Sequence, residues 1–237
     1  MTDMEMTPIE RSVDAAFEKM VQKMDTSKLL TEEEKAELDA KALHNTKMNL
    51  AQYRMYKMDA PKRIILNREK LNYQTAWGDA LESLKKLIGT GTLLVLRGKP
   101  GTGKTQMAVE LMIHGIIDKE LRAKFTTFSR IQMRIKSSFN DTSGEGAVIE
   151  QLIKPDILTI DEFDWIPARK ETVTDDYWQG IMYHIINERY NDMKDTILTS
   201  NKTDDVFAAT TIAPIKSRIE ETGGLVSTDD WKNWRRK

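Results

Sequence analysis

The sequence of 237 residues contains no cysteine, few histidines and no apolar run long enough to cross a bilayer. Without cysteine, the chain cannot form disulfides, thiol catalytic sites, zinc ribbons or iron–sulfur sites. Its three histidines, His44, His114 and His184, are too scattered for a recognisable metal motif. The first ten residues carry acids instead of the apolar core of a signal peptide. We therefore expect a cytoplasmic protein without a membrane partner.

Neither sign of charge is in excess, because 36 lysines and arginines stand against 37 aspartates and glutamates. The net charge of −1 provides no overall attraction for nucleic acid, so DNA binding requires a local basic patch. Hydrophobic residues make up 40% of the chain and charged residues 31%, which is typical of a folded protein with one or two domains.

Residues 1–58 are predicted to form an N-terminal helical region. Thr7-Pro8 is typical of a helix start, and a second start follows at Thr31. The apolar residues after the first start recur at helical spacing: Ile9, Val13, Phe17, Met20, Val21 and Met24. The second helix is expected to reach about Tyr56 with poorer apolar spacing. The region is therefore either a helical pair or a long helical arm.

This N-terminal region holds eight of the thirteen methionines. Methionine is flexible and polarizable, so it packs well against imperfectly matched partners. The composition predicts an arm that docks on another protein, and the alternative is an ordinary small helical core with flexible terminal residues. Residues 59–73 then form a connector in which Pro61 makes a continuous helix unfavourable. Residues 74–237 are predicted to form the main domain.

A phosphate-binding motif opens the main domain. The apolar run Thr92–Leu96 is typical of a strand, and Gln106–Ile117 is typical of a helix. Between them the pattern G-x-x-x-x-G-K-[ST] is complete, formed by Gly98, Lys99, Pro100, Gly101, Thr102, Gly103, Lys104 and Thr105. The glycines let backbone amides surround phosphate oxygens at a helix N-terminus. Lys104 is expected to reach the β- and γ-phosphates of ATP, and Thr105 to bind Mg²⁺.

Two acids follow a second apolar strand, Asp156–Ile160. In P-loop ATPases the first acid of such a pair holds the Mg²⁺ shell and the second polarises the attacking water. These roles fall to Asp161 and Glu162, so the sequence predicts hydrolysis of ATP to ADP and phosphate. A third strand, Thr196–Thr199, leads to Asn201, which is predicted to orient the water. The alternative for Asn201 is a turn residue at a strand end.

The order of these motifs resembles the AAA+ superfamily, and within it the DnaC-type helicase loaders and the IstB-type transposition helper ATPases. The resemblance is carried by GKPGTGKT, LTIDEFD, TILTSN and the stretch Ile185–Tyr190, and it covers about residues 50–237. It implies an α/β fold: a P-loop AAA+ (ASCE) three-layer αβα core with a central parallel sheet. Only 36 residues follow Asn201, so we expect Leu225-Val226 to form the last strand and the C-terminal lid to be reduced. Asp164 replaces the family's glycine, a change expected to matter little.

The resemblance also implies two arginine roles. Ser217-Arg218-Ile219 is similar to the family's arginine-finger stretch, so Arg218 would act in trans on ATP bound by a neighbouring subunit. The aromatic segment Trp231–Arg235 is similar to the family's second-sensor segment, which makes Arg235 the candidate sensor. The alternatives are a surface salt bridge for Arg218 and a basic terminal tail for Arg235.

A basic helical face is predicted after the strand Phe125–Phe128. In similar loaders the corresponding helix faces single-stranded DNA, so Arg130, Arg134 and Lys136 are candidate phosphate contacts. The alternative is a solvated helix face.

Three functions remain open at this stage. In the first, an ATP-dependent helicase loader docks its N-terminal arm on a replicative helicase and delivers the ring onto single-stranded DNA during DNA replication. It would self-associate through the ATP interface. In the second, an IstB-like transposition helper binds DNA and recruits a transposase. The third is an ATP-switched adaptor with negligible turnover. The motifs do not distinguish a helicase partner from a transposase.

Overall fold

The computed structural model describes residues 32–66, 75–139, 144–164, 173–203, 206–207, 211–231 and 233. Its centre is a parallel sheet with the strand order β2-β3-β4-β1-β5. The strands are β1 (Leu93–Arg97), β2 (Ala123–Thr127), β3 (Ile157–Asp161), β4 (Asp195–Ser200) and β5 (Gly224–Ser227). The predicted parallel sheet, including a last strand at Leu225-Val226, is therefore confirmed.

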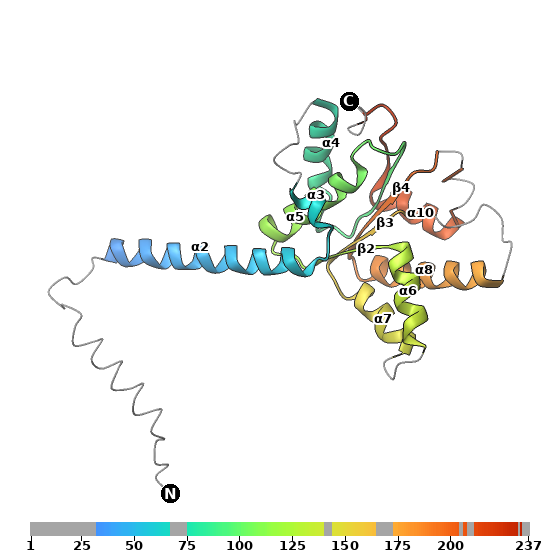
Figure 1. Cartoon of the computed structure of the whole chain (residues 1–237). Helices are drawn as coiled ribbons and strands as arrows, with labels where there is room; N and C mark the ends of the chain where they lie inside the picture. The colour runs from blue at the N-terminus through green and yellow to red at the C-terminus, as the bar shows by residue number, and fades with distance from the viewer. Residues whose placement is uncertain are drawn as a thin grey trace, which may run out of the picture. The chain divides into compact units, whose positions relative to one another are not determined.

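Helices cover both faces of the sheet (Figure 1). One layer contains α3 (Lys62–Leu66), α4 (Thr75–Lys85) and α5 (Lys104–Asp118). The other contains α6 (Phe128–Ser138), α7 (Gly144–Ile153), α8 (Val173–Asn191) and α10 (Ala213–Thr222). Successive strand residues point to opposite faces, so Leu94 packs with the first layer and Val95 with the second. This is the three-layer αβα core that the sequence predicts.

The helix α2 (Glu32–Lys57) corresponds to the second predicted N-terminal helix. The chain divides into two compact units, residues 1–47 and 48–237, so α2 contributes to both. Within the second unit, Ala51 and Met58 are buried in the core layer of α5. The amide of Phe125 donates to the carbonyl of Met58, which covers the outer edge of β2. The first predicted helix, which starts at Thr7-Pro8, lies outside the described residues.

A buried arginine and a buried aspartate fix the start of β4. Arg189, at the end of α8, is fully buried and donates to Thr196 Oγ1 at 3.0 Å. Its other bonds are to the main-chain carbonyls of four residues before β3 and of the first residue of β4, namely Leu152, Ile153, Pro155, Asp156 and Asp195. Burial lowers the pKa of Arg189 to about 9, and burial also raises the pKa of Asp195. Arg189 therefore aligns β3 and β4, the two strands whose far ends carry predicted site residues.

Within the described part of the chain, no helix combines the length and the apolar character needed to cross a membrane.

Candidate functional site

The loop between β1 and α5 has the backbone that its glycines permit. Gly98, Gly101 and Gly103 have φ values of 137°, 90° and 92°, a region that side chains disfavour. A Cβ on Gly101 would lie 2.4 Å from Asn233 Oδ1, and one on Gly98 would lie 2.5 Å from Thr228 Oγ1. The loop ends at the N-terminus of α5, whose first amides provide a partial positive charge. Loop and helix together have the backbone geometry expected of the predicted phosphate site.

Lys104 and Thr105, the first residues of α5, face the loop and β3. The Lys104 side chain is buried, and its ammonium donates to the carbonyls of Gly98 at 2.7 Å and Lys99 at 2.9 Å. The Thr105 hydroxyl donates to Asp161 Oδ1 at 3.0 Å. A hydroxyl beside a carboxylate provides the hard oxygen ligands that Mg²⁺ prefers, with phosphates and water completing its shell. Lys104, Thr105 and Asp161 are thus placed as expected for residues that bind the phosphates of ATP and Mg²⁺.

Thr199 joins the two acids at the end of β3. Its hydroxyl donates to Asp161 Oδ1 and accepts a hydrogen bond from the amide of Glu162 at 3.1 Å. Glu162 is exposed and has φ 57°, an uncommon conformation for a residue with a side chain. Thr199 was missed from sequence, although parallel pairing of Ile160 with Leu198 makes it the neighbour of Asp161.

Asn201 follows β4 and is brought to the phosphate loop by the sheet. β1 and β4 are neighbours, and the amide of Gly98 donates to the carbonyl of Ser200 at 3.1 Å. The amide of Asn201 donates to Asp164 Oδ1 at 2.7 Å. The sequence pattern assigns Asp164 no role, whereas here its carboxylate links the loop after β3 to the end of β4. The carboxyl ends of β1, β3 and β4 therefore carry one cluster of predicted residues.

The segment after β5 packs against the phosphate loop through Thr228, Asp229 and Asn233, three contacts that the sequence did not predict. Thr228 Oγ1 lies 2.7 Å from Thr102 Oγ1, and Asp229 Oδ1 accepts the amide of Lys99 at 3.0 Å. Asn233 Nδ2 donates to the carbonyl of Pro100 at 3.1 Å. The polar residues Thr228, Asp229 and Asn233 gave no signal in the sequence, because their contacts depend on the pairing of β5 with β1. Arg235 lies outside the described residues.

Arg218 is held by its own chain in the helix layer opposite α5. It is half-buried on α10, and its guanidinium donates to Asn187 Oδ1 at 2.5 Å and to the carbonyl of Pro214 at 2.9 Å. The guanidinium carbon lies 4.9 Å from the ring centroid of Tyr190 and 5.5 Å from that of Tyr183. Cation–π contacts of this kind orient an arginine without neutralising it. The stretch Ile185–Tyr190 thus contributes to the placement of Arg218.

The basic face of α6 is exposed as predicted. Ile131 and Ile135 are buried, while Arg130, Arg134 and Lys136 are exposed. Arg134 Nη2 donates to Gln151 Oε1 on α7 at 2.6 Å, and this hydrogen bond orients the Arg134 guanidinium. Because α6 begins directly after β2, it starts at the same edge of the sheet as the acid pair.

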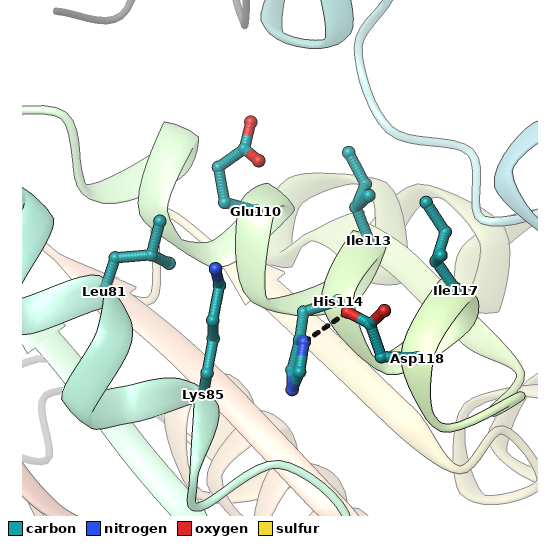
Figure 2. Close-up of a pocket in the computed structure, with 7 residues that line it drawn as sticks. All are labelled: Leu81, Lys85, Glu110, Ile113, His114, Ile117 and Asp118. Carbon is teal, nitrogen blue, oxygen red and sulfur yellow. Dashed lines mark hydrogen bonds and ion pairs between the residues drawn. The ribbon is translucent and has the colours of Figure 1, made fainter. Parts of the chain in front are cut away.

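A small hollow of about 100 Å³ lies between α4 and α5 and is separate from this cluster (Figure 2). His114 Nδ1 and Asp118 Oδ2 are 2.6 Å apart at its edge. The hollow is lined by Leu81, Lys85, Glu110, Ile113, His114, Ile117 and Asp118. None of these residues belongs to the phosphate loop, so the hollow is not the predicted phosphate site.

Known structures share this fold. A crystal structure of the DnaC helicase loader matches with a TM-score of 0.58 and 20% identity, covering 70% of this chain and 99% of that one. The structure of AMPPCP-bound DnaA from Aquifex aeolicus matches with a TM-score of 0.56 and 19% identity, covering 70% of this chain and 51% of that one. The likeness shows that the chain shares the fold of these proteins, a parallel sheet between two layers of helices.

Sequence relatives identify the family. The chain is 28% identical over 109 residues to an Insertion sequence IS21 putative ATP-binding protein of Pseudomonas aeruginosa. That alignment spans 46% of this chain but only 38% of the relative. The family described as IstB-like ATP binding protein matches residues 3–213. Because this match extends over most of the sequence, the chain belongs to the family of IstB-like ATP binding proteins.

Proposed function

We propose that the chain hydrolyses ATP to ADP and phosphate with Mg²⁺ bound between Thr105 and Asp161. The observation that carries this proposal is the single cluster at the ends of β1, β3 and β4. Lys104 binds the terminal phosphates, Glu162 accepts a proton from the attacking water, and Asn201 orients that water. The Mg²⁺ ion supplies charge stabilisation at the phosphates when bound. Arg235 is proposed as a further phosphate contact, supported by the bond of Asn233 to the phosphate loop.

We propose further that the ATPase loads a replicative helicase onto single-stranded DNA. Supporting this, the chain covers 99% of the DnaC helicase loader structure. The N-terminal region offers apolar side chains for a partner: Leu38 and Leu43 are exposed in the first unit, and Leu50, Tyr53 and Tyr56 in the second. The exposed α6 arginines are proposed to contact DNA phosphates. Self-association through the ATP interface would bring Arg218 to a neighbouring subunit.

A second candidate is a transposition helper that binds DNA and recruits a transposase. It is favoured by the relative from insertion sequence IS21. The two functions use the same ATP site and differ in partner and in DNA form. A loader is expected to respond to single strands, whereas the helper is expected to respond to duplex DNA.

The partner proposal predicts that the Glu162→Gln protein, loaded with ATP, captures a replicative helicase from the native host's lysate. Deletion of residues 1–47 is expected to weaken capture, because it removes Leu38 and Leu43. ATP binding is expected to persist, because the second compact unit begins at Met48. A deletion to residue 58 would remove Ala51 and Met58 from the core and so is not a clean test. Mass spectrometry identifies the captured protein, and Met193→Ala, at an exposed turn, serves as control. Recovery of a transposase would instead establish the helper.

The Arg218→Ala variant is predicted to bind ATP normally but to lose at least about tenfold in the hydrolysis rate of the assembly, since one transition-state contact is removed. Mixing it with the Glu162→Gln variant is expected to restore activity, because the Glu162→Gln subunit still supplies Arg218 to the intact site of its neighbour. Steady-state turnover of the mixture is the measurement. Arg122→Ala, which removes an exposed arginine paired with Asp156, is the control. Loss of ATP affinity in a monomer, or no recovery on mixing, contradicts action in trans.

A further inference from the structure

Asp164 makes two hydrogen bonds that close the turn after β4. Its Oδ1 atom accepts the Ser200 hydroxyl at 2.5 Å and the Asn201 amide at 2.7 Å. The Ser200 side chain is fully buried, and its oxygen also accepts the amide of Lys202 at 3.1 Å. One carboxylate oxygen therefore fixes three consecutive residues of this turn, directly or through Ser200.

This turn lies between the phosphate loop and the acid pair at the end of β3. On one side, the carbonyl of Ser200 accepts the amide of Gly98 in the phosphate loop. On the other side, Thr199 accepts the amide of Glu162. Asp164, in the loop after β3, in turn accepts hydrogen bonds from Ser200 and Asn201 at the end of β4. The ends of β3 and β4 are therefore joined by hydrogen bonds in both directions. A displacement of one strand end would consequently move Asn201 relative to Glu162.

We infer that Asp164 is a positioning residue that sets Asn201 relative to Glu162 during ATP hydrolysis. The inference rests on the proposed ATPase activity. Asp164 acts through its neighbours, because its carboxylate oxygen is occupied by Ser200 and by the backbone of Asn201. The hydrogen bond from the Asn201 amide to Asp164 fixes the backbone position from which the Asn201 side chain extends. That side chain is exposed, so it is accessible to a bound nucleotide and to water. A glycine at position 164, as in the family pattern, has no side chain to make these bonds.

The Asp164 carboxylate also carries a negative charge, and the effect of this charge has to be distinguished from the effect of its hydrogen bonds. Its negative charge lies near the half-buried ammonium of Lys202, whose pKa is lowered by burial and raised in part by Asp164. Asparagine at position 164 keeps a carbonyl acceptor of the same size but removes the charge. Alanine removes both. The pair of substitutions therefore distinguishes hydrogen bonding from charge.

The test measures ATP turnover by Asp164→Ala and Asp164→Asn, alone and combined with Asn201→Ala. Asp164→Ala is expected to lower kcat by about 10- to 100-fold with KM changed less than about twofold, because substrate binding is retained and alignment is lost. Asp164→Asn is expected to recover most of the rate. In the Asn201→Ala background, Asp164→Ala is expected to have no further effect, since residues that act as one unit are not additive. Asp192→Ala, at an exposed aspartate paired with Lys194, is the matched control.

Other outcomes overturn the inference. An unchanged kcat in Asp164→Ala would show that the turn after β4 keeps Asn201 in place without the hydrogen bonds to Asp164. Equal damage from alanine and asparagine would assign the effect to charge on Lys202 instead of to hydrogen bonds. Multiplying effects of Asp164→Ala and Asn201→Ala would show independent roles. Wild-type protein and Glu162→Gln measured in parallel separate this failure from that of the proposed function. Absence of turnover in the wild-type protein would overturn the ATPase activity itself, and wild-type turnover in Glu162→Gln would overturn the role of Glu162 as general base.

Discussion

Replacing Glu162 by Gln is expected to lower ATP hydrolysis by about 10²- to 10⁴-fold while ATP remains bound. Glutamine has nearly the same size and can still hydrogen-bond to water, but it cannot accept a proton. The backbone at this position is fixed by the bond from the Glu162 amide to Thr199 Oγ1, which the substitution leaves in place. The lost rate therefore measures the carboxylate and not a displaced loop.

The measurement combines calorimetric ATP binding with release of phosphate, with DNA present in separate reactions. Glu220→Gln, at an exposed glutamate on α10, makes the same chemical change away from the cluster and is expected to keep full turnover. A Glu162→Gln protein that still hydrolyses ATP at the wild-type rate would reject Glu162 as the general base. Conversely, a wild-type protein without turnover under all these conditions would support an ATP-switched adaptor.

The strands and the phosphate loop could be predicted because their signals are local. Thr92–Leu96 is a short apolar run, and the glycines of the next eight residues report backbone conformations that only glycine adopts easily. The second acid, Glu162, was placed by its position directly after a buried strand. These features depend only on residues that are neighbours in the sequence, so they can be predicted without knowledge of the fold.

The residues that support the site could not be found in this way. Thr199, Asp164 and Asp229 owe their roles to partners on other strands or loops. A threonine in a strand and an aspartate in a turn are common, and only the strand order reveals which side chains meet. Similarly, the predicted N-terminal region spans residues 1–58, yet Met58 at its end is buried in the core. This burial follows from the position of edge strand β2, which the sequence does not disclose.

Lys104→Ala is the substitution expected to act on ATP binding itself, weakening the affinity by at least about 100-fold. The Lys104 ammonium lies within the curve of the phosphate loop, 2.7 Å from the carbonyl of Gly98 and 2.9 Å from that of Lys99. ATP brings phosphate oxygens to this loop, and their negative charge makes them stronger partners for the ammonium than neutral carbonyls. Alanine removes the charge and both bonds.

Calorimetric titration with ATP and Mg²⁺ measures the loss, and thermal unfolding without nucleotide tests whether the loop remains folded. Lys216→Ala, at an exposed lysine on α10, removes the same charge at a distance from the loop and is expected to leave ATP affinity unchanged. Loss of binding in a protein with a normal melting temperature would assign the ammonium to the phosphates, since the glycine backbone is intact. Wild-type affinity in a folded Lys104→Ala protein would mean that the loop amides alone bind the nucleotide, and Lys104 would then serve to close the loop through its two carbonyl bonds.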